Sequence, residues 1–324
     1  MKQSKFLKSI GVLILIITTL SSVVACKNIS ENKVEAKAPF FKLSLAQWSF
    51  HRTFRSDETS PYEFAKMANE LGFEGLEYVN ALYPDVMNSE DKPTAIKNFV
   101  EKNNAFAAEY KMQNVLIMID DEGDLSSSDA ESRMSAIENH KLWIKAAHEM
   151  KCSSVRLNLY GEKDPEKWIE NSIKSLTTLS DYAAPLNINV IVENHGRITS
   201  NVPLLMQAIN GSQKSNCGTL PDFGNFCLAE EGYGSIFNGA CSDSYDPYLG
   251  VKEMMTRAFG VSAKSNDFDS EGNETTLDFV KLMTIVKAAG YTGFVGVEYE
   301  GSRLSEKDGI IATKKLLETI GARL

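Results

Sequence analysis

Two spacings of apolar residues alternate along residues 42–324. Short runs rich in Val, Ile, Leu and Phe predict strands, and these runs are 42–51, 75–80, 114–120, 154–160, 188–196, 218–225, 258–265 and 293–301. Helical spacing fills segments between them, including 60–72, 133–150, 166–186 and 276–290. Ser60 and Pro61 have the character of an N-cap followed by proline at the first helical position, and Gly72 and Gly290 that of C-cap glycines.

The alternation of strands and helices predicts the fold class. Strands separated by helices form a parallel sheet covered by helices, and eight strands is the number that closes into a barrel. We therefore expect an α/β fold, a (β/α)8 TIM barrel in a single domain over residues 42–324. An open doubly wound sheet is the alternative, and it is disfavoured because "SFHRTFRS" follows the first apolar run where a glycine-rich phosphate turn would stand.

The first 41 residues have a different character. A basic start, "MKQSKFLKS", precedes the apolar "IGVLILIITTL", which is short for a membrane span, and then "SSVVAC". Small residues leading into Cys26 resemble the lipobox of bacterial lipoproteins. The resemblance implies a signal peptide at 1–25, lipid attached to Cys26, a flexible tether at 26–41, and an exported, membrane-anchored protein on the periplasmic or cell-surface side. A plain signal peptide with an incidental cysteine is the alternative.

The net charge limits which partners are expected, and the cysteine content bears on disulfide formation. Removal of three lysines with residues 1–25 takes the net charge from −9 to −12, and an acidic surface repels phosphate backbones, so nucleic acid is not an expected partner. Membrane contact is expected only through the lipid. The remaining cysteines form no CxxC pair. In an oxidising compartment, spacing favours a Cys227–Cys241 disulfide; buried free thiols are the alternative.

Nearly every predicted strand ends on an ionisable side chain. The set is His51, Glu77, Asp120 with Asp121, Arg156, Glu193, Asp222, Lys264 and Glu298. Because catalytic groups of such barrels lie at the C-terminal strand ends, Glu193, Asp222 and Glu298 are expected to share one cation. Oxygen ligands of this kind suit Mg²⁺ or Mn²⁺. The alternative is that each acid caps a helix or forms a structural ion pair.

Four of these segments carry a family resemblance. "VIVENHG", "LPDFGNF", "VSAKSNDFD" and "FVGVEYEG", in this order, resemble the xylose isomerase-like superfamily of sugar isomerases, ketose 3-epimerases and endonuclease IV-type enzymes. The resemblance implies a metal held by Glu, Asp, His and Glu from successive strands, three of which are Glu193, Asp222 and Glu298. Ser262 stands where the superfamily's "HxK" has its histidine, and Asn225 where "DxxH" has its own. Loss of a nitrogen ligand favours Mn²⁺ or Mg²⁺ over Co²⁺ or Zn²⁺, and His195, water or substrate is left to complete the shell.

The resemblance also implies a chemistry. We expect a metal-dependent sugar isomerase or epimerase that abstracts a proton next to a carbonyl and forms an enediolate, with Glu193 and Glu298 as the acid/base pair. The expected substrate-binding residues are Trp48, His51, Glu77, Arg156, His195, Asn225, Ser262 and Lys264. His140 and His148 lie within a helical segment, and we expect no catalytic role for them.

The expected substrate is a non-phosphorylated carbohydrate. Exported space holds little sugar phosphate, and residues 265–274 are acidic where barrels often bind phosphate. Elimination on a 3-keto-glycoside at the same site and a non-catalytic sugar-binding lipoprotein are the alternatives. A DNA repair enzyme is disfavoured because the chain has only four histidines and a negative charge. Homo-oligomerisation is left open.

Overall fold

The computed structural model describes residues 38–56, 58–230, 234–237, 239 and 241–324. The signal peptide, the lipidation at Cys26 and most of the tether lie outside the described residues and stay predictions. Phe41, assigned above to the tether, is buried in the core, so the packed domain includes it. None of the helices in the described part of the chain combines the length and apolar character needed to cross a bilayer.

The described strands form one parallel sheet in the order β6-β5-β4-β3-β2-β1-β8-β7. Its members are β1 (Lys42–Ala46), β2 (Gly75–Val79), β3 (Gln113–Met118), β4 (Ser154–Leu157), β5 (Asn189–Glu193), β6 (Cys217–Leu220), β7 (Val261–Ser265) and β8 (Phe294–Tyr299). Parallel bridges Thr219↔Ala258 and Asp222↔Ser262 join the β6 and β7 segments. The two ends of the sheet therefore meet, which confirms the predicted (β/α)8 barrel and excludes the open sheet.

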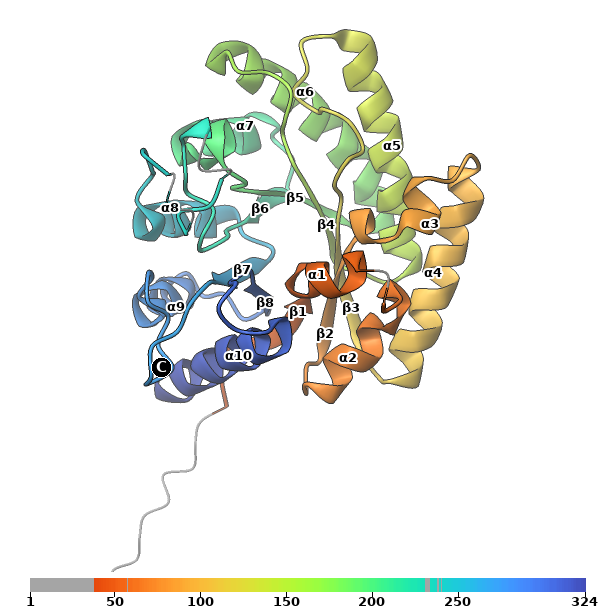
Figure 1. The fold of residues 1–324 in the computed structure, drawn as a ribbon. Coiled ribbons are helices and arrows are strands. Elements are labelled where there is room, and N and C mark those ends of the chain that lie inside the picture. The colour runs from red at the N-terminus through yellow and green to blue at the C-terminus, as the bar shows by residue number, and fades with distance from the viewer. Residues whose placement is uncertain (1–37, 57, 231–233, 238, 240) are drawn as a thin grey trace, which may run out of the picture. The chain divides into compact units, whose positions relative to one another are not determined.

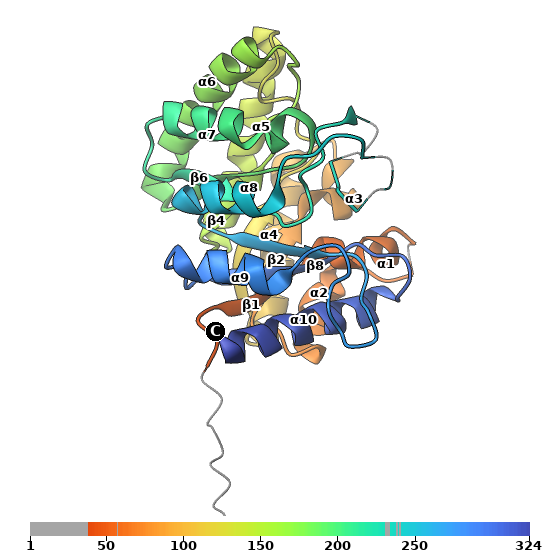
Figure 2. The same cartoon turned by 90° about the vertical axis from the view of Figure 1, so that its left-hand side faces the viewer.

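Helices follow one another around the outside of this sheet (Figure 1), and the view turned by 90° shows α8, α9 and α10 beside each other (Figure 2). Their bounds are α1 (His51–Arg55), α2 (Phe64–Glu70), α3 (Pro84–Met87), α4 (Lys92–Glu109), α5 (Ala130–Glu149), α6 (Pro165–Ala183), α7 (Val202–Gly211), α8 (Pro247–Met254), α9 (Phe279–Ala288) and α10 (Glu306–Arg323). Ser60 caps the short helix at Pro61–Glu63 through the Tyr62 amide, as predicted. Gly72 and Gly290 have φ of +71° and +76°, the left-handed conformation expected of C-cap glycines.

The first strand is shorter than predicted. It ends at Ala46, and a 3-10 turn (Gln47–Phe50) leads into α1. The side chain of Gln47 accepts a hydrogen bond from the backbone of Val79 at 2.9 Å and donates one to the hydroxyl of Tyr83 at 2.9 Å. The Gln47 side chain thus replaces the backbone hydrogen bond that a longer first strand would make to Val79. His51 consequently begins a helix rather than ending a strand, and the prediction that placed it at a strand end is wrong.

Cysteine pairing follows the spacing argument. Cys227 and Cys241 form a disulfide with 5.8 Å between their Cα atoms, whereas Cys152 and Cys217 are buried free thiols. The disulfide joins two points of the segment between β6 and α8. The same segment carries Asp222 and Asn225 at its start, directly after β6.

Candidate active site

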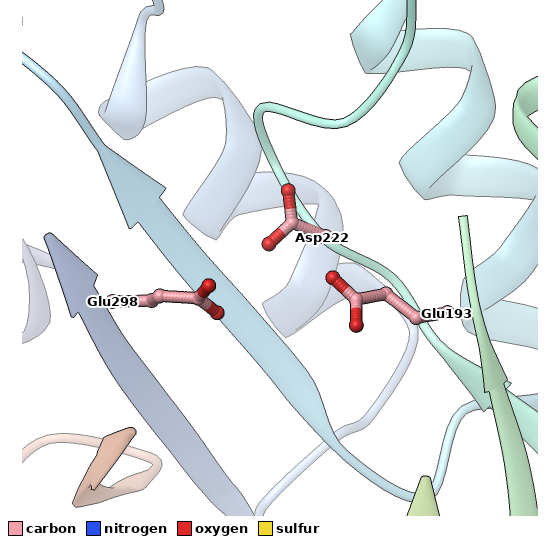
Figure 3. A group of neighbouring side chains, drawn as sticks. All are labelled: Glu193, Asp222 and Glu298. Atoms are coloured by element: carbon pink, nitrogen blue, oxygen red, sulfur yellow. The ribbon is translucent and has the colours of Figure 1, made fainter. Parts of the chain in front are cut away.

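Three carboxylates meet at the C-terminal ends of the strands. Glu193 is the last residue of β5, Asp222 follows β6 by two residues, and Glu298 lies in β8. One oxygen from each lies within 4.8 Å of the others, and all three side chains are buried. Figure 3 shows Glu193 and Glu298 approaching from opposite sides with Asp222 beside the space between them. The three acids therefore converge, as the strand-end pattern predicts.

Asn194 fixes Asp222 relative to Glu193. Its amide nitrogen donates to the backbone oxygens of Asp222 and Asn225, both at 3.0 Å, and its amide oxygen accepts from the Asp222 backbone at 2.8 Å. Asp222 Oδ1 in turn accepts from the backbone nitrogens of Gly224 and Asn225. Glycine at position 224 allows close packing, because a Cβ there would lie 2.3 Å from the Phe237 ring. The loop after β6 is thereby folded back on the end of β5, and Asp222 Oδ2 is directed to the cluster.

Ser262 links the other two acids. Its Oγ lies 2.6 Å from Asp222 Oδ2 and 2.9 Å from Glu298 Oε2, so its single proton is shared between two carboxylates. The residue lies in β7 and bridges directly to Asp222 along the backbone. At the position where the resembling superfamily has an imidazole, this chain has a hydroxyl that orients the acids.

Two buried cations flank the cluster. Arg156 Nε lies 2.9 Å from Glu193 Oε2, and its Nη1 donates to Asp120 Oδ1 at 2.6 Å. On the opposite side Lys264 Nζ lies 3.5 Å from Glu298 and 3.1 Å from Glu300. Each of the two glutamates in the cluster is therefore paired with a buried basic side chain, Glu193 with Arg156 and Glu298 with Lys264.

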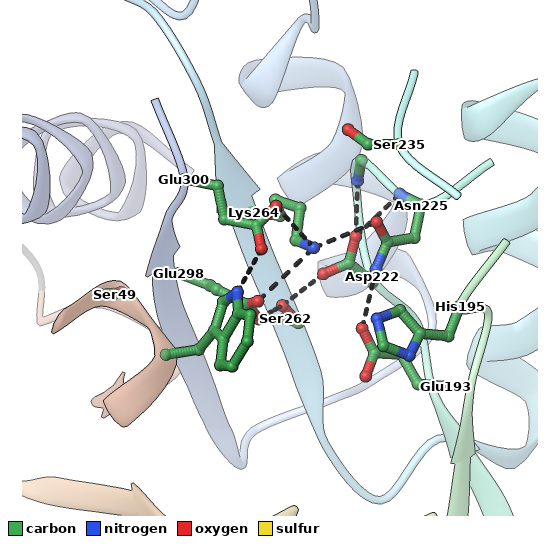
Figure 4. A network of polar contacts seen from close by, with 12 residues as sticks. Ser49, Glu193, His195, Asp222, Asn225, Ser235, Ser262, Lys264, Glu298 and Glu300 are labelled. Carbon is green, nitrogen blue, oxygen red and sulfur yellow. Dashed lines mark hydrogen bonds and ion pairs between the residues drawn. The ribbon is translucent and has the colours of Figure 1, made fainter. Parts of the chain in front are cut away.

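Asn225 connects the two sides (Figure 4). Its amide oxygen accepts from Lys264 at 3.1 Å, and its amide nitrogen donates to Glu193 Oε1 at 3.0 Å. This pairing fixes the orientation of the amide. Asn225 thus holds the β5 acid and the β7 lysine in one hydrogen-bonded network.

Burial perturbs the ionisation of these groups. It raises the pKa of Glu193 to about 7, against the lowering effect of Arg156, and it raises the pKa of Asp222 well above its ordinary value despite the nearby Lys264. Burial alone would lower the pKa of Lys264, but the carboxylates of Glu300 and Glu298 hold it well above the usual range. A carboxyl with a pKa near 7 is suited to exchange protons at neutral pH.

The charge balance of the site fits a bound dication. Five carboxylates (Asp120, Glu193, Asp222, Glu298 and Glu300) lie with two basic groups (Arg156 and Lys264) among the contacts of the described residues. When all are ionised, three negative charges are in excess, and uncompensated buried charge is strongly unfavourable. A bound dication would reduce this excess to one negative charge. An all-oxygen donor set matches the preference of Mg²⁺ and Mn²⁺.

His195 adjoins the cluster as a neutral side chain. Burial, assisted by Arg156 and Lys264, lowers the pKa of its imidazole to about 4. The Asn158 amide donates to Asp120 at 2.8 Å, so its oxygen, 2.9 Å from His195 Nδ1, is the acceptor for a proton there. The Tyr160 hydroxyl also lies 2.7 Å from Nδ1. His195 Nε2 is then unprotonated and can accept a hydrogen bond.

Two of the predicted substrate-binding residues, His51 and Glu77, make no hydrogen bond or ion pair to the cluster among the contacts of the described residues, whereas Trp48 does reach the site. His51 Nδ1 bonds to the Trp48 backbone oxygen at 2.7 Å, and its ring stacks on the Trp48 indole. Trp48 reaches the site through its indole nitrogen, which donates to Glu300. Glu77 lies deeper in the barrel, where Ser44 donates to it at 2.5 Å and a Cβ at position 296 would lie 2.6 Å from its Oε2. This geometry gives His51 and Glu77 supporting positions and does not place them at a substrate.

Glu300, Asn158 and Tyr160 belong to the network and were not predicted. Each follows a predicted site residue at an even spacing: Glu300 is two residues after Glu298, and Asn158 and Tyr160 are two and four after Arg156. Within the predicted strands 154–160 and 293–301, side chains alternate between faces with a period of two, so the sequence pattern puts all three on the same side as the predicted residue. This alternation is the signal that could have identified them.

Comparison with known proteins places this geometry in a family. The xylose isomerase-like TIM barrel family model matches residues 65–320, whereas no curated protein matches the chain. Among solved structures, the D-allulose 3-epimerase from Methylomonas sp. has a TM-score of 0.64 at 13% identity, covering 88% of this chain and 99% of that one. The 3-keto-D-glucoside 4-epimerase from E. coli has a TM-score of 0.61 at 14% identity, covering 86% and 99%.

A third structure comes from Mycobacterium smegmatis, a xylose isomerase-like TIM barrel protein in complex with magnesium. Its TM-score is 0.60 at 15% identity, and the match covers 87% of this chain and 97% of that one. At these identities the structural matches show the shared fold, and the family model spans most of the barrel. The chain therefore belongs to the xylose isomerase-like TIM barrel family.

Proposed function

We propose that the protein is a divalent-metal-dependent isomerase or epimerase that moves a proton next to the carbonyl of a non-phosphorylated sugar. The observation that carries this proposal is the buried cluster of Glu193, Asp222 and Glu298, with oxygens within 4.8 Å of one another. Glu193, Asp222 and Glu298 would hold the ion, for which Mg²⁺ and Mn²⁺ are the best fit. The sugar epimerases among the structural neighbours support the reaction class.

The chain's own residues then divide the reaction between them. A bound dication would polarise the substrate carbonyl and acidify the adjacent C–H. Glu193 would remove the proton as the general base. Glu298 lies on the opposite side of the cluster (Figure 3), held by Ser262 and Lys264, and would enter the step protonated and give its own proton to the substrate from that side. Glu193 then releases the abstracted proton to water, and Glu298 takes up a new one from water before the next turnover.

Charge distribution in the enediolate-like state assigns the remaining roles. Lys264 and Arg156 are buried cations beside the two glutamates, and they stabilise negative charge as it develops on the substrate oxygens. His195 Nε2, unprotonated at neutral pH, accepts a hydrogen bond from a sugar hydroxyl. The excess of carboxylates in the site disfavours a phosphorylated substrate.

Isotope exchange tests the proposal. Free ketoses and 3-keto-glycosides are incubated with the protein in deuterated water with Mg²⁺, Mn²⁺, Co²⁺ or Zn²⁺, and recovered sugars are examined by mass spectrometry. We expect deuterium in an intact sugar, lost with chelator and lowered by about 10²-fold or more in Glu193→Gln and Glu298→Gln. Glu318→Gln, an exposed change on α10, is the control and should exchange at the wild-type rate.

The other outcomes separate the alternatives. Release of the aglycone from a keto-glycoside would show elimination at the same site, because proton abstraction next to the ketone expels a leaving group. Sugar binding with no exchange under any metal would identify a binding protein and end the catalytic proposal. Exchange that survives in both Gln variants would remove the two glutamates from the mechanism.

We also propose that the protein is exported and lipid-anchored at Cys26. The Cys227–Cys241 disulfide supports an oxidising compartment. Mass analysis of the protein from its native membrane should show an N-terminal diacylated Cys26, and Cys26→Ser should leave the protein unlipidated. An intact N-terminus retaining residues 1–25 would overturn the proposal.

A further inference from the structure

A cavity of about 300 Å³ lies on the side of β1–β5 and is linked to the carboxylate cluster through Asp120 and His195. Its walls come from the segments that follow these strands and include Trp48, Arg55, Ala81, Asp120, Asn158 and His195. The cluster itself belongs to β5, the segment after β6, and β8. The open end of the barrel is therefore divided into a reactive half and a second half with its own cavity.

The two halves share walls. Asp120, which lines the cavity, bonds to the same Arg156 that pairs with Glu193. Trp48, on another side of the cavity, donates to Glu300, the partner of Lys264. His195 lines the cavity and lies beside the cluster (Figure 4). A ligand that extends from the carboxylates past His195 would enter this cavity.

The cavity lining is polar and carries no excess of positive charge. Asp120, Asp121 and Asp124 line it, with Arg55 as the cation among the lining residues. Glu122 also lines it but is buried and neutralised by Lys92, 2.8 Å away. Phosphate and other anions are disfavoured by this balance. Hydroxyl groups match it, because carboxylate oxygens and His195 Nε2 accept hydrogen bonds while Arg55 and Asn158 can donate them.

The aromatic surface of the cavity is already engaged. The guanidinium carbon of Arg55 lies 4.7 Å from the Trp48 ring centre, and the His51 ring is stacked on the same indole at 4.9 Å. Recognition in the cavity therefore depends on hydrogen bonds more than on stacking against a free ring face. This is a requirement that a polyhydroxylated ring meets and an apolar aglycone does not.

We infer that this cavity binds the second unit of a neutral disaccharide-type glycoside, whose other unit lies at the carboxylate cluster. The inference rests on the proposed function for the placement of the reacting unit. It narrows the substrate from sugars in general to uncharged glycosides of two linked sugar units. Ala81, half-buried at the cavity wall, marks the space that the second unit fills.

Binding measurements test this without turnover. Calorimetry on the purified protein compares cellobiose, maltose and sucrose with methyl β-glucoside, methyl α-glucoside and glucose 6-phosphate. We expect at least one disaccharide to bind about tenfold or more tighter than its methyl glucoside, and the phosphate to gain no such advantage. Ala81→Phe, which fills the cavity, should bring the ratio of the two affinities close to one.

Two further variants keep the result interpretable. Ala312→Phe adds the same volume in a separate groove beside α10 and should leave the ratio unchanged. Arg55→Ala is an exposed change that should lower the disaccharide advantage several-fold even if Ala81→Phe fails to fold. Equal binding of disaccharides and methyl glucosides, binding of none of the probes, or equal effects of the two Phe variants would overturn the inference. A disaccharide advantage without deuterium exchange would retain this subsite and remove the proposed catalysis; exchange without the advantage would do the reverse.

Discussion

Replacing Glu77 with glutamine should stabilise the protein, and increasingly so as the pH rises. The side chain is 1% exposed, its Oε1 accepts from Ser44 at 2.5 Å, and Oε2 has no hydrogen-bond partner among the described residues. Burial raises the pKa of Glu77 from 4.5 to about 8; the Ser44 hydrogen bond opposes this, and the charges of Glu298 and Glu193 add to it. The carboxyl is therefore neutral in the folded protein at pH 7.

The sign and size of the effect follow from linkage. Between about pH 4.5 and 8 the folded chain keeps a proton that the unfolded chain loses, so the free energy of unfolding falls as the pH rises through this window. The difference between the unfolded and folded pKa values of Glu77, converted at about 1.4 kcal/mol per pH unit, lowers the free energy of unfolding by at most about 5 kcal/mol. This lowering is complete above pH 8. Glutamine has the same shape and no charge, so it removes this loss.

Urea unfolding of wild type and Glu77→Gln at about pH 5, 6.5 and 8 measures the effect. Chelator is present throughout, because a bound dication would favour the ionised form of Glu77. We expect the variant to match wild type within about 1 kcal/mol near pH 5 and to exceed it by about 3–5 kcal/mol near pH 8. Glu74→Gln, an exposed neighbour on the same segment, should show no such trend. A Glu77→Gln difference that is constant with pH, or that favours wild type at high pH, would refute the reasoning.

Three further changes test other parts of the structure. Ser262→His should raise the affinity for Zn²⁺ relative to Mg²⁺ by about tenfold or more, because an imidazole replaces a hydroxyl that contacts two of the three carboxylates; calorimetric titration with each metal measures this, and an unchanged ratio would contradict it. Gly196→Ala should lower the free energy of unfolding by about 1–3 kcal/mol, since φ is +84° and the new Cβ would lie 2.2 Å from Gly234 Cα; Gly239→Ala, with open space around it, is the control. Reduction of the Cys227–Cys241 disulfide should destabilise the protein by up to about 3 kcal/mol, and Cys227→Ser/Cys241→Ser should melt at the same temperature with and without reductant.

Much of this site could be predicted because strand side chains obey a simple periodicity. Glu193, Asp222 and Glu298 each follow an apolar run, and in a parallel barrel all such positions lie at one end of the sheet. Chain order then brings strands five, six and eight to one side of that end. Arg156 and Lys264 were found by the same rule, and the structure pairs each with one of the glutamates.

The end of the first strand could not be predicted by this periodicity. "KLSLAQWSFH" intersperses polar residues with apolar and aromatic ones and contains no glycine or proline. Nothing local therefore distinguishes a ten-residue strand from a five-residue strand that turns into a helix. The turn is imposed by Gln47, whose side chain bonds to residues 79 and 83 on the next β–α unit. Such a long-range hydrogen bond leaves no periodic trace, so His51 was assigned to the wrong element.

Ser262 replaces the histidine of the resembling superfamily, and its contacts in the structure show what the hydroxyl does instead. Loss of the histidine suggests from the sequence alone that the site has decayed. A decayed site would be expected to lose the arrangement of the remaining acids, because repulsion between buried carboxylates drives them apart when nothing holds them. Here Ser262 donates toward both Asp222 and Glu298, Asn225 holds Glu193, and Asn194 fixes the loop that carries Asp222. Three separate polar residues preserve a cluster whose charge is unfavourable without a cation, and this arrangement supports the proposed metal site and reaction.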